Sequence, residues 1–253
     1  MKLGMPLLYQ FNTIEENLVL AKKLNLDFIE LNLNFGYCRE EMEAKTVADL
    51  LKKYNIAATL HFYDEADFAS YDEVADAYLK LLKKYAKLGK GYIKMINIHN
   101  NPGPVVTISG VKNYIYEKEY ESYFDRFIYN LRRAEKICNK NGIKMVIENT
   151  KTPNYMLKTY KDLYYLDFKF NYDIGHDYND NQMIYNISKV IPLKFDEFHI
   201  HDANKVKDHL ALTEGEINLK EYKDLATKNN AYVVLEVKNQ EDLEKSVPIF
   251  NNL

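Results

Sequence analysis

Short apolar runs of strand-forming residues alternate with longer amphipathic runs along the whole chain, and this alternation constrains the fold more than any other feature. The predicted strands are Leu3–Tyr9, Phe28–Asn34, Ala57–Tyr63, Tyr92–Asn100, Lys144–Thr150, Phe168–Asp173, Glu197–Asp202 and Ala231–Lys238. Thr13 and Glu16 form a capping signal that opens the first helix. The later helical patterns cover Glu41–Tyr54, Tyr71–Leu88, Glu117–Asn139, Met156–Tyr165, Asn181–Ile191, Leu219–Lys228 and Glu241–Ile249. Strands and helices that alternate in this way are typical of a parallel α/β sheet.

A closed (β/α)8 barrel fits this pattern better than an open doubly wound sheet. The strands are near-continuous hydrophobic runs, as expected for strands that are covered on both faces. An open sheet usually has a glycine-rich turn after its first strand, but the segment 9–12 (YQFN) contains no glycine. The length of 253 residues matches the ~250 residues of one TIM barrel. We therefore predict a single TIM-barrel domain over residues 1–253, in which the irregular segment Pro102–Tyr116 covers the site as a flap.

Charge and composition exclude several classes of protein. The net charge of −3 and the isoelectric point near 6.1 give no basic footprint, so a nucleic-acid partner is not expected. No apolar run approaches the ~20 residues of a membrane span, and Gln10 and Asn12 come too early for a signal sequence. Cys38 and Cys138 are typical of unpaired thiols in a reducing compartment. We expect a cytoplasmic protein without a membrane partner, and the sequence leaves a homo-oligomer open.

The histidines of this chain are not scattered. All six fall at or just after the C-terminal ends of predicted strands, and none falls in a predicted helix: His61, His99, His176, His199, His201 and His209. Purely structural histidines should not select one rim of a barrel, and this rim is where the active sites of TIM barrels lie. The histidines therefore predict a functional site at the mouth of the barrel.

Three carboxylates end strands at the same rim: Glu148, Asp173 and Glu236. Burying an unpaired carboxylate costs several kcal/mol, and no lysine or arginine in the strand runs could obviously serve all three. A divalent metal bound by these carboxylates and by His199 would compensate them together. Glu30 is either a structural hydrogen-bond acceptor or a substrate contact. His201 beside Asp202 is expected to form a hydrogen-bonded pair behind the metal ligands.

Several motifs resemble one known superfamily. The segment 198–202 (FHIHD), followed by 207–210 (KDHL) and 214–217 (EGEI), resembles the seventh strand and the following loop of the xylose-isomerase-like TIM barrels. Segments 147–149 (IEN), 173–176 (DIGH) and 235–236 (LE) are similar to the strand five, six and eight signatures of that superfamily. The superfamily includes sugar and sugar-phosphate isomerases and epimerases, and also endonuclease IV.

The resemblance implies a metal-dependent sugar or sugar-phosphate isomerase or epimerase that acts through an enediolate. Glu148, Asp173, His199 and Glu236 match the metal-ligand positions, and the two glutamates also match the acid/base catalysts. The metal would be one Mn²⁺, Co²⁺, Mg²⁺ or Zn²⁺ ion, and the substrate a small sugar or polyol. His176 matches a substrate-contacting histidine. Lys205 falls near a position where epimerases often have an arginine. The aromatic residues Phe35, Tyr37, Phe62 and Tyr63 either form a wall for a sugar face or pack at the rim.

An endonuclease IV-like zinc phosphodiesterase acting on abasic-site DNA is the alternative. Eight positions match that family's zinc ligands: His61, His99, Glu148, Asp173, His176, His199, His209 and Glu236. The ninth ligand, an aspartate, is replaced by Lys207, and Asp208 is shifted by one residue. A three-zinc cluster would thus lack one carboxylate, although additional zinc could bind at His61 and His99 with Glu148. The loops after the first two strands carry no positive charge for DNA, so the isomerase interpretation is favoured over the nuclease. The intact metal-ligand set favours it over a non-catalytic sugar-binding barrel.

Overall fold

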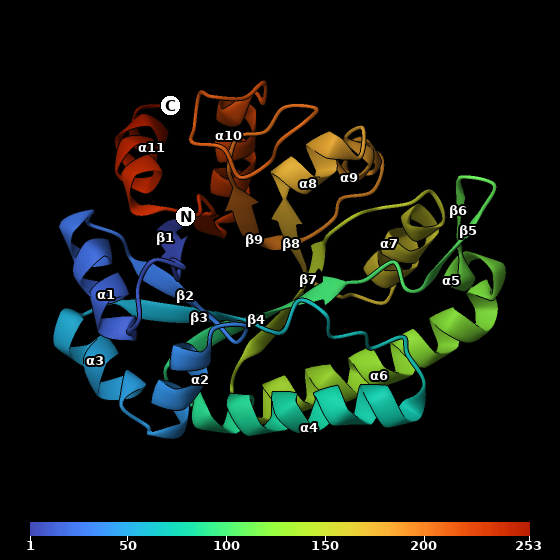
Figure 1. Cartoon of the computed structure of the whole chain (residues 1–253), viewed down its shortest axis with the longest axis horizontal. Helices are drawn as coiled ribbons and strands as arrows, with labels where there is room; N and C mark the ends of the chain where they lie inside the picture. The colour runs from blue at the N-terminus through green and yellow to red at the C-terminus, as the bar shows by residue number, and fades with distance from the viewer.

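Eight parallel strands close into a barrel in the computed structural model, which describes residues 1–253 (Figure 1). The barrel strands are β1 (Lys2–Pro6), β2 (Phe28–Asn32), β3 (Ala57–His61), β4 (Ile93–Asn100), β7 (Lys144–Asn149), β8 (Phe170–Asp173), β9 (Phe195–Ile200) and β10 (Tyr232–Leu235). Their order is β1-β10-β9-β8-β7-β4-β3-β2, and β1 pairs in parallel with both β10 and β2, which closes the ring. The predicted TIM barrel is confirmed.

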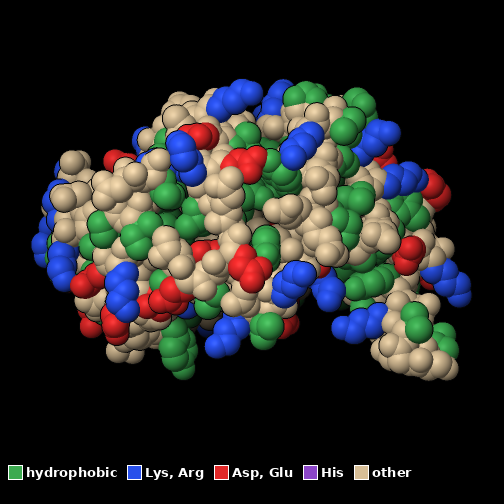
Figure 2. Space-filling view, turned by 90° about the horizontal axis from the view of Figure 1, so that it is seen from above, with side chains coloured by type: hydrophobic (Ala, Val, Ile, Leu, Met, Phe, Trp, Pro, Cys, Tyr) green, Lys and Arg blue, Asp and Glu red, His purple; other side chains and the backbone are tan.

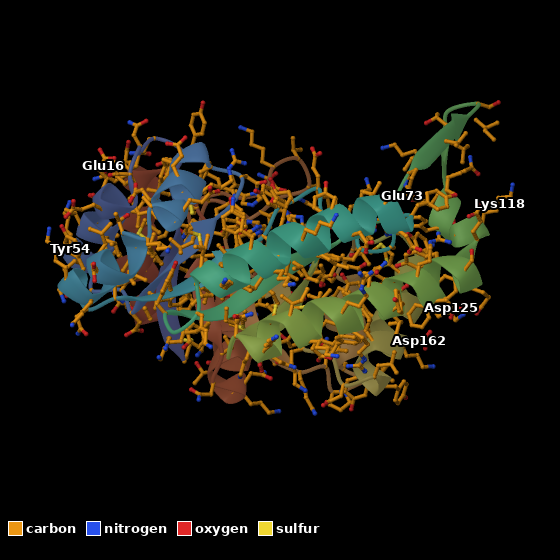
Figure 3. The ribbon with its side chains drawn as sticks, turned by 90° about the horizontal axis from the view of Figure 1, so that it is seen from below. Glu16, Tyr54, Glu73, Lys118, Asp125 and Asp162 are labelled. Carbon is orange, nitrogen blue, oxygen red and sulfur yellow. The ribbon has the colours of Figure 1, made fainter.

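Helices follow the strands and cover the outside of the barrel (Figure 1). They are α1 (Ile14–Lys23), α2 (Gly36–Glu43), α3 (Val47–Tyr54), α4 (Asp72–Leu88), α5 (Ile115–Lys118), α6 (Tyr120–Lys140), α7 (Tyr155–Tyr165), α8 (Ile174–Asn179), α9 (Met183–Ser188), α10 (Leu219–Asn229) and α11 (Gln240–Asn252). The long helices α4 and α6 lie side by side along one side (Figure 3). The predicted capping box of α1 is present, since the Thr13 side chain accepts the Glu16 N–H and the Glu16 carboxylate accepts the Thr13 N–H.

Three predicted helices are divided or shortened. The segment Glu41–Tyr54 forms parts of two helices, because Lys45 adopts a left-handed conformation with a φ of 61° between α2 and α3. The predicted helix Asn181–Ile191 is reduced to α9, because Asn181 and Gln182 also have positive φ angles. The segment Glu117–Asn139 is divided at Glu119 between α5 and α6. Periodicity alone did not detect these breaks, since residues other than glycine occupy them.

The segment Pro102–Tyr116 is not irregular as predicted. It contains an antiparallel hairpin of β5 (Val105–Ile108) and β6 (Val111–Tyr114). Ser109 and Gly110 at its tip both have positive φ angles, which is the backbone conformation of a tight hairpin turn. The hairpin stands out from the barrel, with exposed residues on both strands, beside the short helix α5 that carries Lys118 (Figures 2 and 3). It does not cover the mouth as a flap.

The barrel is built around one large apolar core, within which a small set of polar side chains is buried at the mouth end of the strands. Cys38 and Cys138 are both buried and unpaired, as predicted. None of the helices combines the length and the apolar character that crossing a membrane requires. The buried polar residues include carboxylates and imidazoles from neighbouring strands, and they define the site described next.

Candidate metal centre

Four neighbouring strands position the predicted ligands. Glu148 lies in β7, Asp173 ends β8, His199 lies in β9, and Glu236 follows the last residue of β10. Because these strands are consecutive in the barrel, and Asp173 is in register with His199, the side chains reach one space. Each of the four residues is at most 6% exposed. Burial of three carboxylates this close together requires compensating positive charge.

The imidazole of His199 is the centre of this group. Its Nδ1 atom lies 3.4 Å from Glu148 Oε1, 3.3 Å from Glu236 Oε2 and 4.0 Å from Asp173 Oδ2. Neither His199 Nδ1 nor Glu236 Oε2 has a hydrogen-bond partner, although both atoms are buried. Unpartnered buried polar atoms are rare in folded proteins. Three carboxylates and one imidazole nitrogen that face a common space, with two of these atoms unpaired, fit the ligand set of a divalent cation.

The other nitrogen of His199 faces away from this space. His199 Nε2 lies 3.2 Å from Glu30 Oε1, and Glu30 is 1% exposed. A proton on Nε2 that is donated to Glu30 would leave Nδ1 free to bind a cation, an arrangement common behind metal-binding histidines. Burial lowers the pKa of His199, but the surrounding carboxylates outweigh this effect and hold it well above its usual value, so a cation would displace the proton on Nδ1. This placement favours the role of hydrogen-bond acceptor for Glu30 over substrate contact. Glu197, also in β9, lies beside this pair, and burial raises its pKa to about 8, so Glu197 is mainly protonated at neutral pH.

A second group of potential ligands adjoins the first through Glu148. The Nε2 atoms of His61 and His99 lie 3.2 Å apart, and they are 3.4 Å and 3.7 Å from Glu148 Oε2. The amides of Asn97 and Asn171 also donate to this oxygen. Burial lowers the pKa of His61, but the hydrogen bond to Glu148 and the nearby carboxylates outweigh this effect and raise it to about 10. His61 therefore carries a proton that a metal ion would have to displace.

A third group adjoins the first through Glu236 and Asp173. His209 Nε2 is 3.3 Å from Glu236 Oε2, and His209 Nδ1 is 3.0 Å from Asp208 Oδ1. His176 Nδ1 lies 3.6 Å from Asp173 Oδ2. His176 is in the first turn of α8, whereas the sequence predicted no helical histidine. Lys207 stands where the resemblance expects an aspartate, but the shifted Asp208 lies beside His209, which has a φ of 53°, and groups with His176 and His209, so it is a candidate for that position.

Sequence reasoning missed the contacts of His201. The sequence predicted that this fully buried residue forms a hydrogen-bonded pair with Asp202, but His201 forms no hydrogen bond with the Asp202 side chain. Its Nε2 lies 3.2 Å from Asp173 Oδ1, and its Nδ1 accepts the backbone N–H of His209 at 2.8 Å. Asp202 instead accepts backbone N–H groups of the following loop, from residues 203, 213 and 217. His201 thus connects Asp173 to the loop that carries His209.

Lys238 was also missed as a member of the site. No lysine or arginine was expected to serve all three carboxylates, and Lys238 does not contradict this, because its Nζ pairs with Glu236 Oε1 alone, at 2.7 Å. The predicted strand Ala231–Lys238 does contain Lys238, two residues after Glu236. Alternate residues of an extended chain face the same side, so this spacing was a usable signal.

Other predicted substrate contacts lie away from the centre. Lys205 is exposed and lines a separate surface cavity with Lys207 and Glu216, so its placement does not support the predicted substrate contact. Phe62 is buried in the core, and the Tyr37 hydroxyl contacts Asn17. The mouth instead has a cavity of about 480 Å³ with a polar lining: His99, Asn101, Pro102, Thr150, Lys151, His176, Asn179, Asp180 and Asp208.

Comparison with known sequences gives one family and one relative. Residues 18–252 match the family model of the xylose isomerase-like TIM barrel. An uncharacterized protein of Methanocaldococcus jannaschii is 26% identical over 200 residues, which cover 76% of this chain and 74% of that protein.

Solved structures with the same fold include several sugar epimerases. A D-tagatose 3-epimerase-like protein has a TM-score of 0.76 at 18% identity, covering 100% of this chain and 99% of its own. The 3-keto-D-glucoside 4-epimerase of E. coli has a TM-score of 0.75 at 14% identity, with 100% of both chains covered. The D-allulose 3-epimerase of Methylomonas sp., in complex with D-allulose, has a TM-score of 0.69 at 15% identity, covering 99% of this chain and 90% of its own. At these identities the likeness is one of fold.

Proposed function

Because this chain belongs to the xylose isomerase-like TIM-barrel family, we propose that it is a divalent-metal-dependent isomerase or epimerase of a small sugar or polyol. The observation that carries the proposal is the convergence of three carboxylates on His199 Nδ1, within 3.3 to 4.0 Å. The names of the structurally similar sugar epimerases support the same reaction class.

Glu148, Asp173, His199 and Glu236 would hold one divalent ion, Mn²⁺, Co²⁺, Mg²⁺ or Zn²⁺. Such an ion would act as a Lewis acid for a carbonyl oxygen and for the negative charge that develops on it. The two unpartnered buried atoms, His199 Nδ1 and Glu236 Oε2, support this ligand set. Glu30 would keep His199 in the tautomer that offers Nδ1.

Glu148 and Glu236 are the proposed acid/base pair. They come from β7 and from the end of β10, which flank β8 and β9, so their carboxylates reach the substrate space from two sides. One carboxylate would take the proton from the carbon next to the carbonyl and the other would return a proton, to the same carbon in epimerisation or to its neighbour in isomerisation. A carboxylate oxygen has a second lone pair, so a metal ligand can also accept a proton.

The polar cavity at the mouth is the proposed binding space for the rest of the substrate. Its lining offers hydroxyl, amide, carboxylate and imidazole groups, which suit a polyhydroxylated chain. His176 lines this cavity and is proposed to contact a substrate hydroxyl. The charge of three carboxylates would be balanced by one divalent ion and by Lys238, so an uncharged sugar suits the single-metal site better than a sugar phosphate. Lys151 is the cationic group in the cavity that a phosphate would use.

An activity screen combined with variants tests the proposal. We would incubate the metal-loaded protein with ketohexoses and ketopentoses in deuterated water and follow exchange at the carbon next to the carbonyl by NMR. Metal-dependent exchange that disappears in Glu148→Gln and Glu236→Gln is the expected result. Exchange that persists in both variants would refute the acid/base roles, and a failure of every sugar to exchange would count against the reaction class.

A zinc phosphodiesterase of the endonuclease IV kind is the second candidate function. It is favoured by one observation: the two further groups, His61–His99–Glu148 and His176–Asp208–His209, adjoin the first. Additional zinc ions could bind there. The overall charge of −3 does not favour a DNA partner. Two or three bound zinc ions together with cleavage of abasic-site DNA would decide for this function.

A further inference from the structure

Lys238 holds one oxygen of a proposed metal ligand. Its ammonium group lies 2.7 Å from Glu236 Oε1, and Glu236 is its only ion-pair partner. The Glu236 side chain is 8% exposed, whereas the Lys238 side chain is 54% exposed, so the lysine extends from the surface to a buried carboxylate. An ion pair with one buried member is stronger than a surface pair, because solvent screens it less.

The other oxygen of Glu236 has a different environment. Glu236 Oε2 is buried without a hydrogen-bond partner and lies 3.3 Å from both His199 Nδ1 and His209 Nε2. The two oxygens of a free carboxylate are equivalent and exchange by rotation of the side chain. Here the bond to Lys238 removes that equivalence, so that a single oxygen faces the imidazoles.

We propose that Lys238 is a positioning residue of this site, which makes Glu236 a one-oxygen ligand and balances the charge of the third carboxylate. This inference rests on the proposed function. Lys238 is expected to have opposite effects on metal affinity and on the rate of turnover. The lysine repels a nearby cation and occupies one ligand oxygen, so it weakens metal binding. It also fixes the proton-transferring carboxylate and favours negative charge developing on the substrate, so it accelerates turnover.

Removal of the charge should therefore separate the two properties. In Lys238→Met we expect divalent metal to bind about tenfold more tightly, which corresponds to ~1.4 kcal/mol. We expect kcat to fall about 10- to 100-fold while KM changes by less than ~3-fold, since the lost interaction acts mainly in the transition state. Lys238→Arg should restore both values toward those of the wild type. Lys238→Gln keeps a hydrogen-bond donor without the charge. It should bind metal more tightly than the wild type does, and it should retain more turnover than the methionine variant.

The experiment is a calorimetric titration of metal-free protein with Mn²⁺, followed by kinetics on the best substrate. Lys245→Met is the matched control, because Lys245 is 53% exposed and pairs with Glu241 at 2.8 Å on α11, outside the site. Metal affinity that is unchanged or weaker in both Lys238→Met and Lys238→Gln would overturn the inference. A wild-type protein that binds no divalent metal would instead refute the proposed function, and so the two failures are distinguishable.

Discussion

Replacement of Glu30 by glutamine tests how this barrel presents His199 to a metal. Glu30 Oε1 lies 3.2 Å from His199 Nε2, and both side chains are essentially inaccessible to water. Glutamine has nearly the same size, but its NH₂ group can turn toward the ring. Donation from that group would favour the tautomer with the proton on Nδ1, and Nδ1 would then have no lone pair for a cation.

The size of the expected loss in metal affinity follows from the burial of the contact between Glu30 and His199. A hydrogen bond to a charged group contributes about 1.5–3 kcal/mol, and loss of such a partner behind a metal-binding histidine typically lowers metal affinity by about 10- to 100-fold. Water cannot replace a partner that is 1% exposed. We therefore expect Glu30→Gln to lie in the upper part of this range, at about 30- to 100-fold.

The assay is titration of the metal-free proteins with Mn²⁺ or Zn²⁺, with the folded state verified by circular dichroism. Glu40→Gln is a suitable control, since Glu40 is an exposed glutamate on α2. The control should bind metal as the wild type does. Equal affinity in Glu30→Gln and wild type would refute the argument that Glu30 sets the tautomer of His199.

Three further predictions concern the same centre. Glu148→Gln and Glu236→Gln should each lower kcat by about 10²- to 10⁴-fold with an intact fold. Steady-state kinetics measure the loss of turnover, and thermal melts verify the fold. Normal turnover in either variant would remove that residue from the acid/base pair. Metal at 100 times its Kd should stabilise the protein by about 2.7 kcal/mol, or roughly 5–10 °C in Tm, and an EDTA-treated sample with an unchanged Tm would argue against a bound metal. The metal-free protein should lose stability as the pH rises from 6.5 to about 10. Burial lowers the pKa of His61, but neighbouring carboxylates outweigh this effect and raise it to about 10, and the stability that a raised histidine pKa contributes is lost through that interval. A Tm measured in EDTA that rises over this pH range would contradict the assignment.

Much of this fold could be predicted from the sequence because the barrel repeats one strong pattern. Apolar strands covered on both faces and amphipathic helices give separate periodicities, and the closed parallel sheet follows from their alternation. The breaks could not be predicted in the same way. Lys45 and Gln182 adopt left-handed backbone conformations that residue type alone does not signal, and the hairpin β5–β6 depends on a turn whose first residue is Ser109 rather than asparagine or aspartate.

The centre of the site was predictable for a related reason. Residues at strand ends, such as Glu148 and His199, are positioned by the barrel itself, so their order along the chain indicates their neighbourhood. Residues on loops are positioned by local backbone conformation. Asp208 could not be assigned to His209, and Lys205 could not be separated from the mouth, until the loop after β9 was known.

The central claim is that Glu148, Asp173, His199 and Glu236 hold one divalent cation. The most direct test is a crystal structure of the Mn²⁺-loaded protein, with anomalous data collected at the manganese absorption edge. The account predicts an anomalous peak within about 2.0–2.3 Å of His199 Nδ1 and of oxygens from the three carboxylates. A loaded crystal with no peak at these four residues, or with peaks only at the outer histidine groups, would contradict it.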